Sequence, residues 1–424
     1  MRSAEVIAVG SEMLGSTRTD TNSLYVADRL SSIGIDLRVK TVVGDERDDL
    51  ASVVRQALDR VDVVVLTGGL GPTDDDLTRD VVAEVLERPM SIDESIVAKI
   101  RARFERRGLT MPEVNRRQAL VPRGAAVLDN PNGTAPGLFI EHAGARGPQA
   151  IVLLPGPPRE MQPMLDRVCR GPLGALAGGE RTYRTSLFLT GRGESHVEQK
   201  VQPIYSRWRD EQRPIVTTIL AAMGQIELHL SVRDSDEARA RSRLARARDE
   251  LLAVIGEDIY STDGRVMEEV VGDLLKSRGY TVAAAESCTG GLFSSRLTDV
   301  AGSSAYVRCG VVAYANEEKT SLIGVSAELI AAHGAVSEPV AVAMAEGIRE
   351  RSGADVAVGI TGIAGPGGGT PEKPVGTVAI AVIVRNQPAY VRTYQFIGGR
   401  AMVKFQATQA AMDRIRRMLL SDDR

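Results

Sequence analysis

Short runs of apolar, mostly β-branched residues alternate with stretches of helical periodicity over the first 164 residues. This alternation is typical of a parallel sheet covered by helices. It predicts strands at 5–9, 36–43, 61–66 and 150–154, and helices at 22–33, 47–60, 77–86 and 92–107. The glycine- and proline-rich stretch at 171–179 that follows is predicted to be a linker.

The pattern changes after residue 181 to strand, helix, two strands and helix. The strands are expected at 183–191, 215–220 and 225–232, and the helices at 193–205 and 235–255. A third α/β region begins with a helix at 266–277 and a strand at 281–285, and ends with a helix at 400–420. The 424 residues therefore predict an α/β protein of three domains, at 1–170, 180–258 and 262–424.

Composition indicates folded domains that bind small molecules. Apolar residues make up 43% and charged residues 25%, and 52 basic residues nearly balance 55 acidic ones, so no overall charge attracts nucleic acid or a membrane. The 42 glycines and 4% aromatic residues favour tight turns around a small ligand over base stacking. Three widely spaced cysteines, without a signal peptide or a long apolar run, predict a cytoplasmic protein.

The first candidate site follows the apolar strand VDVVVL. The segment TGGLGPTDDDLT, 67–78, places Gly68, Gly69 and Gly71 at a strand end that opens into a helix, where backbone amides can approach a phosphate. Asp74 is expected to cap the helix. The other acids, Asp75, Asp76 and Asp80, are candidate ligands for a hard divalent cation.

Further segments around this site carry a family resemblance. GSEMLGSTRTDTNSLYVADRLSSIGIDLRVKTVVGDE, 10–46, and LPGPPREM, 154–161, resemble the molybdopterin-binding fold of MoaB and MogA proteins. MPEVNRRQAL and NPNGTAPG, with Asn115 and Asn132, resemble the N-terminal domain of the CinA family. The resemblance implies a metal-dependent ADP-ribose pyrophosphatase in which Asp45 and Asp76 are functional and Glu12 aligns with the opening acidic position. With the motif residues, the expected substrate contacts are Glu12, Gly68, Gly69, Gly71, Asn115 and Asn132, and the expected ligands of a divalent ion are Asp45, Asp75, Asp76 and Asp80.

The second candidate site follows the strand TVAAA. In ESCTGG, 286–291, Ser287 lies at a strand-to-helix turn, which suits a nucleophile. His333 is the one histidine of this region and lacks triad spacing, so we expect the base to be Lys319 of YANEEK, 314–319, which must then be uncharged. Tyr314 would relay the proton or orient the lysine. The rival nucleophile Cys288 is expected to point away as a buried filler.

A third segment, GITGIAGPGGGTPEKPVGT at 359–377, again puts glycines after an apolar strand and could cradle a phosphate or ribose. Lys373 and Arg400 are candidate partners for a substrate phosphate, although either could be a solvated surface cation.

In this order and spacing the three segments resemble the CinA C-terminal domain, the nicotinamide-nucleotide amidase family also called PncC. The resemblance implies deamidation of nicotinamide mononucleotide without a cofactor, by a homodimer. It assigns Ser287 as nucleophile, Lys319 as general base and Tyr314 as supporting hydroxyl, with ligand contacts from Thr289, Gly290, Thr361, Gly365 and Arg400. The chain reads GGR at 398–400 where the family has GDR, so an aspartate that could orient Arg400 is missing.

The middle region corresponds to the KH-like segment of the family but has no GXXG loop, which disfavours nucleotide clamping of the KH kind. Two alternatives to a bifunctional enzyme of pyridine-nucleotide recycling remain. One is a competence- or damage-response protein that binds nucleic acid. The other keeps the N-terminal domain as a molybdopterin-binding or adenylyl-transfer module.

Overall fold

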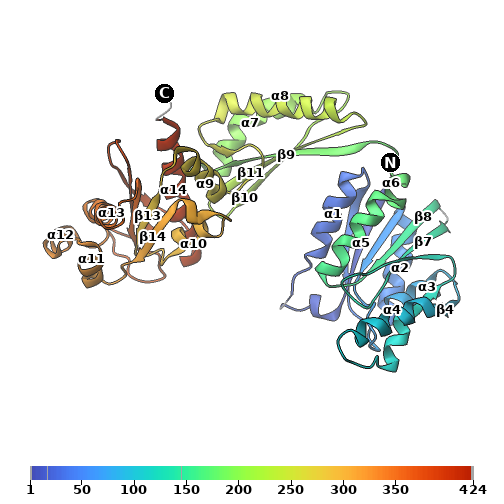
Figure 1. Cartoon of the computed structure of the whole chain (residues 1–424). Helices are drawn as coiled ribbons and strands as arrows, with labels where there is room; N and C mark the ends of the chain where they lie inside the picture. Colours follow the sequence, from blue (N-terminus) through green and yellow to red (C-terminus); the bar gives the residue numbers. More distant parts are fainter. Residues whose placement is uncertain (1, 17, 145, 422–424) are drawn as a thin grey trace. The chain divides into compact units, whose positions relative to one another are not determined.

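The computed structural model describes residues 2–16, 18–144 and 146–421. Its helices and strands form two compact units, one of residues up to 183 together with 233–240, and one of 184–232 together with 241–424 (Figure 1). The predicted α/β class is confirmed for both units. No helix in these residues is long and apolar enough to cross a membrane.

The first unit is built on a sheet in the order β2-β1-β3-β8-β7-β6. The four predicted strands are confirmed as its parallel part: β1 (Ser3–Val9), β2 (Asp36–Val43), β3 (Val63–Thr67) and β8 (Gly147–Leu154). Two strands that the pattern did not predict, β7 (Gly137–Gly144) and β6 (Ala125–Leu128), extend it antiparallel. The sheet is therefore mixed and not purely parallel.

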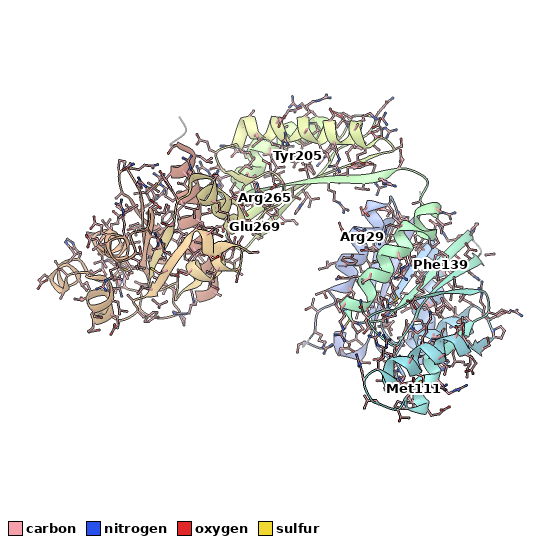
Figure 2. All side chains as sticks on the ribbon, viewed as in Figure 1. Arg29, Met111, Phe139, Tyr205, Arg265 and Glu269 are labelled. Carbon is pink, nitrogen blue, oxygen red and sulfur yellow. The ribbon has the colours of Figure 1, made fainter. Side chains whose placement is uncertain are left out.

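Helices cover both faces of this sheet in three layers. The apolar sides of α1 (Asn22–Ser32) and α5 (Pro158–Arg170) share one core with the buried Phe139, which Figure 2 labels. The helices α2 (Arg47–Arg60) and α3 (Thr78–Val85) share another core on the opposite face. The predicted linker at 171–179 was wrong in part, because α6 (Pro172–Leu176) lies there and buries Leu173 in the first core.

A smaller layer extends the first unit. It consists of α4 (Glu94–Glu105), the two-stranded ribbon of β4 (Met90–Ile92) and β5 (Leu120–Pro122), and the 3₁₀ helix η2 (Glu113–Ala119), and its own apolar cluster includes Ile96, Val97, Ile100 and Ala119. A second 3₁₀ helix, η1 (Ser11–Met13), follows β1.

The middle region of the chain has the predicted order of elements. These are β9 (Arg181–Leu189), α7 (Glu194–Trp208), β10 (Val216–Ala222), β11 (Gln225–Asp234) and α8 (Glu237–Ile255). A further strand, β12 (Ile259–Ser261), completes a sheet in the order β10-β11-β9-β12. Alternate residues of β11 are buried, which gives this sheet one covered face.

The C-terminal region carries a sheet in the order β14-β13-β15-β16-β17. Its strands are β13 (Val282–Glu286), β14 (Val307–Val312), β15 (Val356–Gly362), β16 (Thr377–Val384) and β17 (Tyr390–Gln395), of which the first three are parallel. One core contains residues of α9 (Met267–Arg278), α10 (Leu292–Thr298) and α14 (Arg400–Ser421). The other contains residues of α11 (Asn316–Ile323), α12 (Ala327–His333) and α13 (Glu338–Ser352).

Small side chains on the sheet let α13 approach closely. The strand positions facing this second core include Ala283, Ala285, Ala357, Ala379 and Ala381. At Gly359 a Cβ atom would lie 2.1 Å from the carbonyl oxygen of Ala341 on α13. This close packing of α13 on the sheet fixes the positions of β13, β14 and β15.

Candidate active sites

Three of the motifs in the C-terminal region meet at one edge of its sheet. Strand β13 lies between β14 and β15, and Glu286 at its end is in register with Val312 and Ile360. The strands are parallel, so the loops that begin at Ser287, Ala313 and Ile363 leave from the same edge. ESCTGG, YANEEK and the glycine-rich segment are therefore neighbours in the fold.

The turn that holds Ser287 is fixed by backbone contacts. The Ser287 N–H donates to the carbonyl of Ile360 at 2.9 Å, and the Gly290 N–H donates to the carbonyl of Ser287 at 3.0 Å. Gly290 has φ 60° and Gly291 φ 88°, in the left-handed region that glycine adopts without strain. Ser287 is 8% exposed, so its hydroxyl sits in a sheltered place.

Glu286 in the same motif has a structural role that the sequence analysis did not predict. Its buried carboxylate accepts hydrogen bonds from the N–H groups of Phe293 (3.0 Å) and Ser294 (2.9 Å) and from the Ser294 hydroxyl (2.8 Å). It therefore satisfies amides at the start of α10 that would otherwise lack partners.

The turn leaves some donors open. Within the described residues, the N–H groups of Thr289 and Gly291 donate to no backbone carbonyl, whereas the Gly290 N–H is already bonded within the turn. The Thr289 hydroxyl is buried and has no hydrogen-bond partner in that part of the chain. A polar group of a ligand would satisfy these donors.

Lys319 is buried at the same sheet edge. Its side chain belongs to a residue that is 1% exposed, and its Nζ donates to the carbonyl of Tyr314 at 2.9 Å. Burial lowers the pKa of the Lys319 amine, and the negative charge of Glu317 acts in the opposite direction. Among the described contacts, no hydrogen bond joins Lys319 Nζ to Ser287 Oγ directly.

Among the described contacts, Tyr314 meets Lys319 through its backbone carbonyl and meets Arg400 through its hydroxyl. The side chain is 58% exposed, and its hydroxyl accepts a hydrogen bond from Arg400 at 3.1 Å. A second nitrogen of Arg400 donates to the carbonyl of Gly365 at 2.9 Å. These two contacts orient Arg400 in place of the absent aspartate, and they leave its charge without a carboxylate partner among the described residues.

Burial sets the chemistry of Cys288. The residue is 5% exposed, and burial raises the pKa of its thiol to about 12. At pH 7 the thiolate fraction would then be about 10⁻⁵, which makes this sulfur a poor nucleophile.

Two predicted residues and one unpredicted residue complete this site. Thr361 donates to the carbonyl of Ala335 at 2.8 Å, and Lys373 donates to the carbonyl of Val336 at 2.7 Å, so both fasten the loop between α12 and α13. Lys404 on α14 was not predicted. A Cβ atom on Gly290 would lie 3.5 Å from its Nζ, so its charge reaches the Ser287 turn.

The first unit has a separate cavity of about 680 Å³ at the carboxyl ends of its parallel strands. Among the residues that line it are seven predicted ones: Glu12, Asp45, Gly68, Gly69, Gly71, Asp75 and Asp76. Gly68 has φ 104°, and a Cβ atom there would lie 2.2 Å from the Val9 carbonyl oxygen, so only glycine lets β3 turn this close to β1.

Contacts within the loops hold two of the acids in place. Asp45 accepts from the Ser11 N–H at 2.7 Å, and Asp76 accepts from the N–H and hydroxyl of Thr73 at 2.9 and 2.5 Å. These bonds fix the direction of both carboxylates at the cavity wall.

Other predicted residues lie outside the cavity lining. Asp74 and Asp80 pair with Arg117 at 2.9 and 3.2 Å. Asn115 is buried and donates to Gln118 at 3.0 Å, and Asn132 donates to the carbonyl of Arg159 at 2.8 Å. These side chains contact other residues of the loops and do not line the cavity.

The proposed metal ligands are not brought together as one group. Among residues 2–16, 18–144 and 146–421, no set of three or more His, Cys, Asp or Glu side chains could hold a metal ion. A closed site made only of protein ligands does not fit. A magnesium ion is usually bound by substrate phosphates and water together with only one or two protein carboxylates. Asp45, Asp75 and Asp76 line the cavity and would supply them.

Comparison with known proteins bears on the whole chain. A "CinA-like protein" of Acidobacterium capsulatum is 45% identical over 98% of this chain and 100% of its own length. One of Koribacter versatilis with the same description is 43% identical over 98% and 100%. The chain belongs to the CinA family.

Two domain models match this CinA-family protein, "Probable molybdopterin binding domain" at 5–175 and "CinA C-terminal domain" at 264–419. They confirm the two predicted family resemblances. Among solved structures, the "competence/damage inducible protein CihA" of Agrobacterium tumefaciens is 39% identical and covers 37% of this chain and 94% of its own, with a TM-score of 0.34.

Proposed function

We propose that the C-terminal region of this CinA-family protein hydrolyses the carboxamide of nicotinamide mononucleotide to nicotinate mononucleotide and ammonia. The observation that carries the proposal is the fully buried amine of Lys319, with its lowered pKa, at the sheet edge where the Ser287 turn begins. A neutral amine is the base that a serine nucleophile needs when no histidine is present.

The reaction runs in two halves. In the first half, Lys319 Nζ accepts the Ser287 proton, the serine oxygen bonds to the carboxamide carbon, and the carbon–nitrogen bond breaks as the proton passes to the departing ammonia. In the second half, water gives a proton to Lys319, attacks the ester carbon and releases the serine oxygen, which recovers that proton. The bond from Lys319 to the Tyr314 carbonyl leaves the lone pair of the amine free to accept the proton.

The remaining donors fit the substrate. The N–H groups of Thr289 and Gly291, which donate to no backbone carbonyl among the described residues, would stabilise the oxyanion that develops on the carboxamide. Arg400 and Lys404 would neutralise the substrate phosphate, because neither has a carboxylate partner in the part of the chain that the structure describes.

The test is ammonia release from nicotinamide mononucleotide by the full chain. Ser287→Ala should lower the rate by at least about 10³-fold, because the nucleophile is lost. Cys288→Ala is the matched control at the neighbouring position and should retain the rate within several-fold. Loss of activity in the cysteine variant with retention in the serine variant would overturn the assignment.

We further propose that the first unit hydrolyses the pyrophosphate of ADP-ribose. The support is the cavity of about 680 Å³, which has the size of a nucleotide site and has a glycine turn on its wall beside Asp45 and Asp76. A divalent ion would supply neutralisation of the phosphate charge when bound.

Incubation with ADP-ribose and Mg²⁺ should yield AMP and ribose 5-phosphate, and Asp76→Asn should lower the rate at least about tenfold. Asp74→Asn, which removes a carboxylate outside the cavity lining, is the control and should retain most activity. Tight binding of a pterin without hydrolysis of ADP-ribose would favour the molybdopterin-binding alternative.

A further inference from the structure

The second unit contains a cavity of about 730 Å³ that shares no residue with either candidate active site. One side is formed by the loop after β9 and the β10–β11 hairpin, and the other by β17 and residues 406–417 of α14. Its volume lies within the usual range for small-molecule sites.

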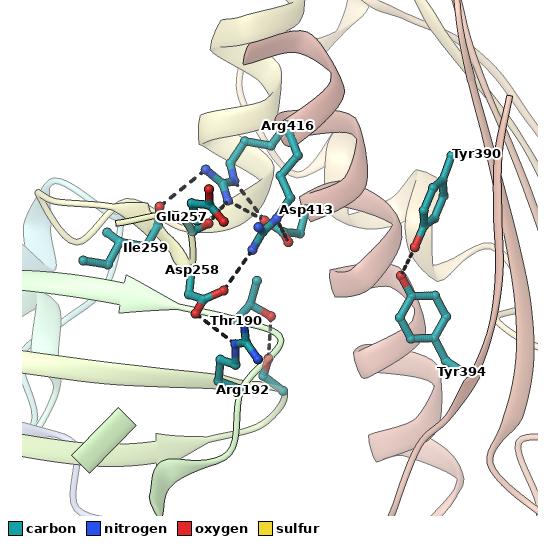
Figure 3. A network of polar contacts seen from close by, with 11 residues as sticks. Thr190, Arg192, Glu257, Asp258, Ile259, Tyr390, Tyr394, Asp413 and Arg416 are labelled. Atoms are coloured by element: carbon teal, nitrogen blue, oxygen red, sulfur yellow. Dashed lines mark hydrogen bonds and ion pairs between the residues drawn. The ribbon is translucent and has the colours of Figure 1, made fainter. Parts of the chain in front are cut away.

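One wall of the cavity is aromatic. Tyr394 on β17 and Phe396, which directly follows this strand, stack with ring centres 5.3 Å apart and planes 6° from parallel. The hydroxyls of Tyr390 and Tyr394 share a hydrogen bond of 2.9 Å, which Figure 3 shows beside α14. The rings therefore form a fixed aromatic cluster.

The cavity lining contains four arginines together with the carboxylates of Glu194, Asp258 and Asp413. Two of its arginines are paired, since Arg192 and Arg417 contact Asp258 at 2.9 and 3.3 Å. Arg392 and Arg414 have no carboxylate partner among the described residues. Their guanidinium groups lie over Tyr394 at 5.1 Å and Tyr390 at 3.9 Å.

A second property of Arg414 also points to a bound anion. Its Nε is buried and makes no hydrogen bond within the described part of the chain. A guanidinium group with an unused donor above an aromatic ring is a common element of sites that bind planar anions.

Buried contacts hold the two sides of the cavity together. Arg416 is 5% exposed and donates to the carbonyls of Glu257 at 3.0 Å and Ile259 at 3.4 Å, while Asp413 accepts from Arg416 at 2.9 Å (Figure 3). The site is therefore formed before any ligand arrives, which lowers the entropy cost of binding.

We propose that this cavity binds a nucleotide, meaning a flat nitrogenous base joined through ribose to a phosphate. The base lies against the ring of Phe396 at the end of the aromatic stack, and the phosphate is bound by Arg392 and Arg414. Binding here does not depend on the proposed deamidation, because none of these residues belongs to that site.

Photolabelling of the full-length protein with 8-azido-AMP tests the proposal. Labelled peptides are mapped by mass spectrometry. We expect label within 390–396 or 406–417, and at least about tenfold less label there in Arg414→Gln. Arg308→Gln on β14, which removes an exposed arginine away from the cavity, should label normally.

The second variant guards against misfolding. Arg392 is exposed, so Arg392→Gln should leave the fold intact and still lower the label severalfold. Unlabelled AMP should compete, whereas inorganic phosphate and adenosine each compete at least about tenfold less well. Label confined to other peptides, equal label in all variants, or equal competition by phosphate alone would overturn the proposal.

Discussion

At the scale of single residues, burial sets the chemistry of the Ser287 turn. The same sheltered environment lowers the pKa of Lys319 and raises that of Cys288 to about 12, because it disfavours both charged forms. Lysine thereby becomes a better base and cysteine a weaker nucleophile.

The pH profile of deamidation follows from the lysine. The rate needs the neutral amine, so it should rise with pH through the lowered pKa of Lys319. The Glu317 carboxylate favours the charged amine, so Glu317→Gln should shift this rise towards lower pH by a few tenths of a pH unit.

Glu318→Gln provides the control for this shift. Glu318 is an exposed neighbour that accepts a hydrogen bond from Ser321 and does not act on Lys319. Initial rates of ammonia release between pH 6 and 10 measure both variants. A shift of equal size in both would contradict the assignment of Lys319 as the titrating group.

The sequence was enough to locate site residues that directly follow a strand. Such residues leave a parallel sheet at the carboxyl ends of its strands, where they become neighbours. Ser287 and the Gly68 turn are examples. The sequence analysis did not predict partners far away in the sequence. Asp80 pairs with Arg117, and Lys404 approaches Gly290, and neither contact follows from local spacing.

At the scale of elements, the regular alternation of apolar strands and amphipathic helices made most of the parallel core predictable. The strands β6 and β7 were missed because they follow an irregular segment with several glycines and prolines. The helix α6 was taken for a linker because its sequence, PLGAL, has a proline and a glycine, yet burial of Leu173 stabilises it.

Glu286 links a strand end to a helix start, which leads to a stability prediction. Glu286→Ala removes three hydrogen bonds from α10 and should lower the free energy of unfolding by about 2–4 kcal/mol. Chemical denaturation followed by circular dichroism measures the change.

Two control variants, Glu286→Gln and Glu318→Ala, separate the loss of these hydrogen bonds from a general loss of negative charge. The glutamine should retain part of the stability through its amide oxygen, and the exposed Glu318 should contribute less than about 0.5 kcal/mol. Equal stability of the Glu286→Ala variant and the parent protein would show that the cap is not needed.

At the scale of the whole molecule, the two candidate active sites lie in different compact units. Each site draws its residues from its own sheet, so each chemistry should survive loss of the other. Ser287→Ala should abolish ammonia release and leave ADP-ribose hydrolysis within about twofold, and Asp76→Asn should do the reverse. Parallel assays on one preparation, with circular dichroism spectra for both variants, measure this. Simultaneous loss of both activities in either variant would contradict separate sites.

The helix α14 has 22 residues and extends about 33 Å at 1.5 Å per residue. Its first turns carry Arg400 and Lys404, and its later turns carry Asp413, Arg414 and Arg417. Because one helix packed in the core carries both sets of charges, the residues proposed to bind phosphate in the two sites are held at a fixed spacing.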